Sequence, residues 1–281
     1  MKFKVQALVG FLATLLLASP SFANNASAAS STTVVQDPHG DLLNGFVQLA
    51  RSTSLYDFQD GTRKDGMDYV ARFNLNLSKQ YLVRVDGSFS QDLNNSDNND
   101  VSDTYISFVR NPSPVGRWVM LGYSLGAVAP TSKDSHTRQN LEGATSAAMI
   151  AMINPDRLIP GFAVVGGISI RKNFHSYDTD INGNVNTEYS SAQSISVGYD
   201  FASGISLSAQ FVHKNGLTYQ NNILESFEHS EEIDYGINQN VAIAIGHTNA
   251  GSVLKANGVD SNIALIDENA SLVYASLTVA F

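Results

Sequence analysis

The sequence predicts an all-β fold, a transmembrane, antiparallel, up-and-down β-barrel of twelve strands. Three observations favour this fold. Apolar and polar residues alternate over many short segments, the connectors alternate between short and long, and helical periodicity is absent. Successive side chains of a strand point to opposite faces, so alternation predicts strands with one apolar and one polar face. A transmembrane barrel needs such strands, because its outer face meets lipid and its interior is polar.

The first 23 residues have the features of a secretory signal peptide. Lys2 and Lys4 supply the positive start, an apolar stretch follows, and residues 21–23 (Ser-Phe-Ala) form a small-x-small cleavage site. Residues 24–40 are small and polar, which predicts a loose periplasmic N-terminal segment. A signal peptide of this kind predicts export from the cytoplasm.

Residues 41–281 form the predicted transmembrane barrel domain. Twelve segments carry the strand pattern, near 43–51, 67–77, 81–90, 102–110, 117–128, 144–153, 162–172, 190–200, 205–214, 230–237, 241–248 and 271–281. Segment 144–153 alternates least, and without it the count would be ten. Beyond the signal peptide no run of 18 apolar residues occurs, so a transmembrane helix is not expected.

The connectors between these segments are sorted by length. Every second connector is short and rich in Gly, Pro or Asn, at 78–80, 111–116, 154–161, 202–204 and 238–240. The others are long and polar, at 52–66, 91–101, 129–143, 173–189, 215–229 and 249–270. This sorting predicts short periplasmic turns at one end of a barrel and long external loops at the other. The even strand count places both ends of the barrel domain on the periplasmic side.

The polar faces of the predicted strands carry charges of both signs. The predicted lumen-lining residues are Arg72, Arg84, Asp86, Asp103, Arg171, Lys214, Glu232 and Asp234. Eight strands enclose an interior filled by side chains, and sixteen to eighteen enclose an aqueous channel. Twelve strands therefore predict either a narrow pore or a plugged one. The charges can filter permeating solutes, or they can pair within a closed barrel.

The last eleven residues supply a resemblance to a known family. Ser271–Phe281 reads SLVYASLTVAF. Every second residue up to Phe281 belongs to a mostly apolar face, and the residues between them form a more polar face. This strand resembles the closing strand of bacterial outer-membrane β-barrels, and the whole chain resembles a small porin or channel of that class. The resemblance implies an outer-membrane location, contact with lipids and lipopolysaccharide, and recognition of the last strand by the assembly machinery. Twelve-stranded members include both solute channels and enzymes.

One motif raises an enzymatic alternative. Gly246–Gly251 (GHTNAG) resembles the His-x-Ser-Asn motif of outer-membrane phospholipase and lipid A deacylase, but one residue is missing. A nucleophile two positions after the histidine would share its face, and that position is Asn249, which cannot attack. Thr248 is expected to point to the opposite face. A lipid-modifying enzyme is therefore an alternative, and the main prediction has no catalytic residues.

No cofactor or metal site is predicted. Asp178–Gly183 (DTDING) matches the opening of a calcium loop, but the twelfth position is Tyr189 where Glu is needed, so a turn at Asn182-Gly183 is expected. The six histidines lack zinc-ligand spacing. The chain has no cysteine and a formal net charge of −9, which argue against disulfides and against nucleic-acid partners.

These observations together predict a porin-like passive channel for small hydrophilic solutes in a bacterial outer membrane. Two alternatives stay open, a lipid-modifying enzyme and a structural or surface-binding barrel without transport. The loop at 129–143 carries several charges and is long enough either to fold inward and narrow the pore or to lie outside it.

Overall fold

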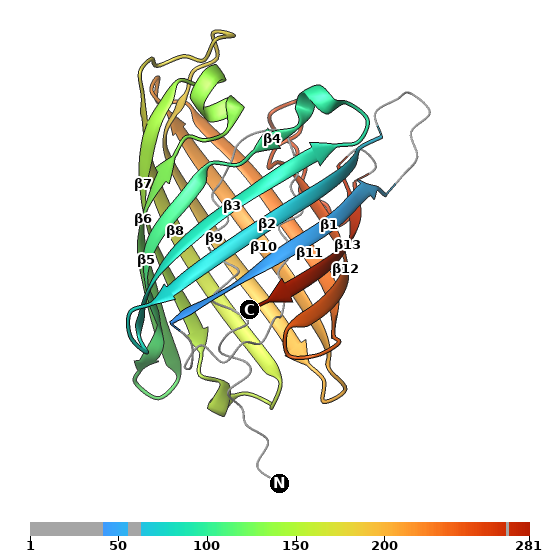
Figure 1. Ribbon diagram of the computed structural model, residues 1–281. Helices are drawn as coiled ribbons and strands as arrows, with labels where there is room; N and C mark the ends of the chain where they lie inside the picture. Colours follow the sequence, from blue (N-terminus) through green and yellow to red (C-terminus); the bar gives the residue numbers. More distant parts are fainter. Residues whose placement is uncertain (1–41, 56–62, 268–269) are drawn as a thin grey trace.

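A computed structural model describes residues 42–55, 63–267 and 270–281 and shows a closed β-barrel (Figure 1). The predicted signal peptide (1–23) and N-terminal segment (24–40) lie outside the described residues. Within the described ranges, no helix has the length and apolar character needed to cross a membrane.

Twelve strands form the wall of the barrel. They are β1 (Leu43–Ser54), β2 (Asp65–Asn76), β3 (Tyr81–Asp92), β5 (Thr104–Val115), β6 (Val119–Ala129), β7 (Leu141–Ile153), β8 (Phe162–His175), β9 (Thr187–Asp200), β10 (Ile205–Thr218), β11 (Ile223–Gly236), β12 (Val241–Ser252) and β13 (Leu272–Ala280). The two-residue strand β4 (Asp100–Val101) pairs with the end of β3. The weakly alternating segment 144–153 is strand β7, so the count of twelve is confirmed.

The wall closes on itself between its first and last strands. All neighbouring strands are antiparallel, and β1 pairs with β13 from Phe46 opposite Ala280 to Ser54 opposite Leu272. Beyond this ladder the backbones of Gly45 and Phe281 exchange hydrogen bonds of 2.9 and 3.0 Å. Closure pairs the polar backbone groups of the first and last strands, which a lipid surrounding requires.

The two faces of the wall differ as the alternation predicts. On β13, Leu277 and Val279 are 41% and 44% exposed on the outer face, whereas Tyr274 and Thr278 are 3% and 0% exposed on the inner face. The same division holds for Tyr69 and Phe73 outside β2 and for Arg72 inside it. The buried part of this protein is therefore the barrel interior, and its surface is a belt of apolar side chains.

Among the residues that the structure describes, three short helical turns lie in the connections. They are η2 (Ser96–Asn98), η3 (Asp134–Arg138) and η4 (Pro155–Arg157). η4 lies in a turn between strands, where Asn154 accepts a hydrogen bond from the Asp156 amide and Pro155 takes the first position, which needs no donor. η3 lies in the β6–β7 loop, near the upper rim in Figure 1.

Two predicted connectors are wrong. The predicted long loop 215–229 is a turn from Tyr219 to Asn222, because β10 and β11 continue to pair up to Leu217 opposite Ile223, and Asn221 adopts a left-handed φ of 63°. The predicted turn 111–116 is largely strand, because β5 continues through both prolines. Its pairing with β6 shifts register between Arg110 and Ser113, so Pro112 falls in an irregularity where its missing N–H is tolerated.

Candidate functional site

The inner wall of the barrel is the candidate functional site, and the structure places most of the predicted lining residues there. Arg72, Arg84, Glu232 and Asp234 are buried on inward-facing positions of β2, β3 and β11. The side chains of Asp86, Arg171 and Lys214 are 16%, 10% and 21% exposed. Asp103 lies just before β5 instead of within a strand, with a side chain that is 12% exposed.

The first charged cluster lies where β2 and β3 pair. Arg72 stands opposite Asp86 in the ladder, and its Nε bonds the Asp86 carboxylate. Arg84 donates from Nε to Asn74 Oδ1 at 2.9 Å, on the next inward pair. The Arg72 guanidinium also lies over the Phe46 ring, 5.4 Å from its centroid. Two guanidinium groups thus share this part of the inner wall with one carboxylate.

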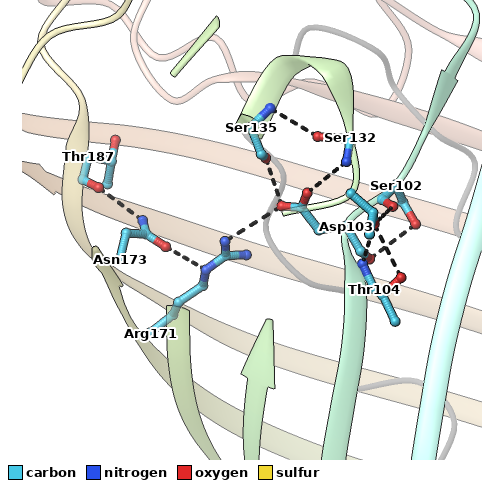
Figure 2. A network of polar contacts seen from close by, with 9 residues as sticks. Ser102, Asp103, Thr104, Ser132, Ser135, Arg171, Asn173 and Thr187 are labelled. Carbon is cyan, nitrogen blue, oxygen red and sulfur yellow. Dashed lines mark hydrogen bonds and ion pairs between the residues drawn. The ribbon is translucent and has the colours of Figure 1, made fainter. Parts of the chain in front are cut away.

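The second cluster joins the β6–β7 loop to the wall, as Figure 2 shows. The Asp103 carboxylate accepts hydrogen bonds from the Ser132 amide at 3.2 Å and from Ser135 Oγ at 2.7 Å. Its Oδ2 also lies 3.9 Å from Nη2 of Arg171. Arg171 in turn donates from Nε to Asn173 Oδ1 at 2.6 Å. One carboxylate therefore holds both the start of the loop and an inward arginine of β8.

The same loop is fixed to a second connection as well. The Ile181 amide donates to the Arg138 carbonyl at 2.9 Å, and Asn186 Nδ2 donates to the Gln139 carbonyl at 3.0 Å. Near its start, the Lys133 amide donates to Asp100 at 3.0 Å. The loop thus spans from the β3–β5 connection to the β8–β9 connection at the upper rim, with its first turn against the inner-wall residue Arg171.

A third group of polar contacts lies on β10, β11 and β13. Lys214 Nζ and Glu228 Oε2 form an ion pair of 2.6 Å. Tyr274 Oη donates to Glu232 Oε2 at 2.9 Å. Glu228 lies in the predicted loop 215–229 and is therefore not among the predicted lining residues. Its spacing of four from Glu232, and of six from Asp234, is the period-two signal that would have extended the strand.

The histidine of the enzyme-like motif lies on the outer face of the wall. His247 is paired with Glu231 on one side and Val273 on the other, and neither position carries a hydroxyl. Thr248 points inward, as predicted, and its Oγ1 donates to the His229 carbonyl at 3.0 Å. The arrangement gives His247 an acidic neighbour, Glu231 Oε2 at 2.9 Å, without a serine or threonine at a paired position.

The predicted turn at Asn182-Gly183 is confirmed. Gly183 has a φ of 84°, and Asp180 Oδ1 accepts from the amides of Asn182 and Asn184 at 2.8 Å each. The Asn184 side chain, followed by these backbone donors, holds the pKa of the Asp180 carboxyl below its ordinary value. These hydrogen bonds stabilise the turn at the tip of the loop.

A hollow of about 760 Å³ lies among β6 to β11. Leu125, Ile170 and Tyr189 contribute to its lining, and all three side chains are on the exposed outer face. Most of the lining belongs to the outer wall, and the inward residue Arg171 also contributes to it.

Comparison with known proteins supports the architecture. No protein-family model matches the sequence, and no curated protein matches it. Among solved structures, the COG4313 outer membrane channel from Pseudomonas putida F1 is similar, with a TM-score of 0.59 and 13% identity over 85% of this chain and 95% of that chain. The chain has the fold of an outer-membrane channel. The NanC porin has a TM-score of 0.53 at 8% identity, covering 84% of this chain and 98% of its own. The KdgM porin in complex with oligogalacturonate has a TM-score of 0.50 at 7% identity, with 84% and 99% covered.

Proposed function

We propose that the barrel is a narrow passive channel that carries small hydrophilic solutes across the outer membrane of a Gram-negative bacterium. The observation that carries this proposal is the division between an apolar outer wall and an inner wall of polar and charged side chains of both signs. A wall of this kind suits lipid on one side and hydrated solutes on the other. The architecture shared with the COG4313 channel supports the same function.

The eight predicted lining charges, with Glu228, act in this proposal as the lining that selects permeants. Rings or patches of charged side chains set ion preference by attracting one sign and repelling the other. On β2 and β3 the two arginines are accompanied by two inward acids, Asp68 and Asp86, whereas β10 and β11 carry one lysine among several acids. Permeating solutes would therefore meet a wall of balanced charge at β2 and β3 and a more negative wall at β10 and β11.

The proposal also includes partners and processing. The apolar belt would contact membrane lipids and lipopolysaccharide, and the last strand with Phe281 would be recognised by the assembly machinery. Residues 1–23 would be removed as a signal peptide, which leaves 24–40 as a periplasmic segment. The exposed Phe281 ring, which contacts Phe73 with centroids 5.8 Å apart, is accessible for such recognition.

Conductance across a planar bilayer tests the channel, and the absence of native cysteine allows a sharp design. Ser194→Cys places a thiol on an inward position of β9, and Ile195→Cys places one on the neighbouring outward position, which is 52% exposed. A water-soluble, charged thiol reagent is expected to reduce the current of Ser194→Cys and to leave that of Ile195→Cys unchanged. A folded protein that gives no current steps in repeated bilayers would contradict the channel.

A further inference from the structure

Three ligand-type side chains meet on the outer wall of β11 and β12, away from the charged interior. Glu231 is paired with His247, and His229 is two residues before Glu231, so the three share one face. The next pair on this face, Ile233 and Ile245, is 58% and 69% exposed, which identifies the face as the outside. Within the described residues, this is the group whose ligand atoms all lie within 4.8 Å of one another.

The carboxylate of Glu231 lies between the two imidazole rings. Its Oε1 is 3.0 Å from His229 Nδ1, and its Oε2 is 2.9 Å from His247 Nδ1. Two nitrogen donors and one carboxylate oxygen are thus gathered on adjacent strands. The rings are tilted by 47° with centroids 5.7 Å apart, so they converge on the carboxylate instead of stacking.

A backbone carbonyl determines the tautomer of His229. The Ala264 carbonyl, which can only accept, lies 2.9 Å from His229 Nε2, so that nitrogen carries the proton. In the neutral ring, the lone pair of Nδ1 then points at the negative carboxylate of Glu231, and these two electron-rich atoms repel each other. A cation bound between Nδ1 and the carboxylate oxygen would turn this repulsion into two attractive contacts. A carbonyl on the far nitrogen is also the usual outer partner of a metal-bound histidine.

Two further polar atoms at this place lack partners among the described residues. His247 Nε2 and Asn249 Oδ1 are buried and accept or donate no hydrogen bond there. Asn249 is 1% exposed and is paired with His229 on the same face, one step along the ladder from His247. Buried polar groups usually have a hydrogen-bond partner, so these two polar atoms without one, beside the cluster, indicate a missing ligand.

The β12–β13 loop covers one side of the cluster. Besides His229, the Ala264 carbonyl accepts from Asn249 Nδ2 at 2.7 Å, and Asn262 Nδ2 donates to the Ser252 carbonyl at 3.1 Å. The His229 side chain is consequently only 6% exposed, whereas the side chains of His247 and Glu231 remain 20% and 43% exposed. The cluster is closed by the loop on one side and open on the other.

We propose that His229, Glu231 and His247 bind a divalent transition-metal ion of the zinc class on the outer wall. Two imidazole nitrogens with one carboxylate oxygen form a donor set that suits Zn²⁺, and three protein ligands leave a coordination position open. The site is separate from the proposed channel, and it holds whether or not the barrel conducts.

Zinc titration of the folded protein tests this site. Protein in detergent is stripped with a chelator and titrated with Zn²⁺ against a chromogenic competitor, and one Zn²⁺ per chain is expected. His229→Ala and His247→Ala are each expected to weaken binding at least tenfold, and Glu231→Gln, which keeps the side-chain shape, is expected to weaken it as well. Co²⁺ in place of Zn²⁺ should give visible absorption bands of a low-coordinate site, and these should disappear in the same variants.

His213→Ala is the matched control, because His213 also lies on the outer wall but hydrogen-bonds Gln193 Oε1 at 3.0 Å instead of the cluster. Its zinc affinity is expected to equal that of the wild type. Circular dichroism, and resistance to unfolding by detergent at room temperature, verify that each variant is folded as a barrel. The proposal is overturned if the folded wild type binds no Zn²⁺. It is equally overturned if the cluster variants bind as tightly as the wild type, or if His213→Ala weakens binding as much as they do.

Discussion

At the scale of single residues, two glycines make room for tyrosines inside the barrel. A Cβ added at Gly246 would meet the Tyr274 ring at 2.3 Å and the Glu231 carbonyl at 2.8 Å. A Cβ at Gly126 would meet the Tyr105 hydroxyl at 2.2 Å. Each tyrosine then reaches a polar partner, Glu232 or Ser146, along the inner wall. The missing side chains therefore position two interior hydroxyl groups.

Gly246→Ala is expected to destabilise the barrel by about 1–3 kcal/mol, because overpacking forces Tyr274 and the neighbouring backbone to shift. Gly87→Ala in β3 is the matched control, since a Cβ there would meet no atom within 4 Å. Urea unfolding in lipid or detergent, followed by tryptophan fluorescence of Trp118, measures both. Equal stabilities of the two variants would show that Tyr274 does not depend on this gap.

Asp86 balances two arginines, so its removal should change ion preference. Asp86→Asn leaves Arg72 and Arg84 without this carboxylate and is expected to shift the channel toward anions, with a loss of stability of about 3 kcal/mol from the broken pair. Reversal potentials in a salt gradient measure the shift. Asp97→Asn, at an exposed position of η2, is the control and should leave the potential unchanged. An unchanged potential in Asp86→Asn would remove this residue from the permeation path.

Alternation predicted which side chains face inward, but it could not predict all of their partners. Arg72 and Asp86 each follow from the polar face of their own strand, and their contact follows from pairing of adjacent strands. The outward cluster of His229, Glu231 and His247 was not predicted. Its histidines are far apart in sequence and become neighbours only through the β11–β12 register. The spacing of histidines within one segment therefore cannot reveal ligands that come together from two paired strands.

At the scale of secondary-structure elements, the β6–β7 loop is held by Asp103. Asp103→Ala removes acceptors for Ser132 and Ser135 and releases Arg171 from its carboxylate neighbour. The loop is expected to become more mobile, with faster amide exchange around η3 and noisier single-channel current. Hydrogen exchange with mass spectrometry measures the first effect and bilayer recording the second. Asp156→Ala, in the turn after β7 at the other end of the barrel, should change neither.

Element boundaries were less predictable than the elements themselves, and the two errors have physical reasons. Residues 215–229 are rich in Asn, Gln, Glu and other polar residues, which is typical of a loop. In the structure the ion pair between Lys214 and Glu228 lies inside, and Phe227 is buried on the other face against the rings of Phe211 and His229. Tertiary contacts therefore extend β10 and β11 beyond their local pattern. The second error, at Pro112 and Pro114, has the same direction and arises because prolines usually mark a turn, whereas a register shift accommodates them here.

At the scale of the whole molecule, closure was the most predictable feature. In a lipid surrounding, a strand with one apolar and one polar face has to turn its polar face away from the lipid, and twelve such strands in sequence can do so around a common interior. The meeting of β1 with β13 satisfies the backbone groups of both ends of the sheet. Whether the interior is filled or open was harder to predict from the sequence. Whether twelve strands enclose a filled or an open lumen depends on side-chain size and on pairing across the interior, which alternation does not encode.

The proposed surrounding of the barrel gives the last prediction. Ile168 lies at the middle of β8, is 46% exposed, and is paired with the 49% exposed Met149. If this face contacts hydrocarbon, Ile168→Lys must place an ammonium group there at a cost of about 2–4 kcal/mol. The free energy of unfolding of this variant in lipid vesicles, measured by urea titration, is therefore expected to be lower than that of the wild type by that amount. Val259→Lys, at an 80% exposed position of the β12–β13 loop, should fold as the wild type does. Equal tolerance of the two lysines would mean that water, and not lipid, surrounds this face, since only a hydrocarbon environment distinguishes the two positions by free energy.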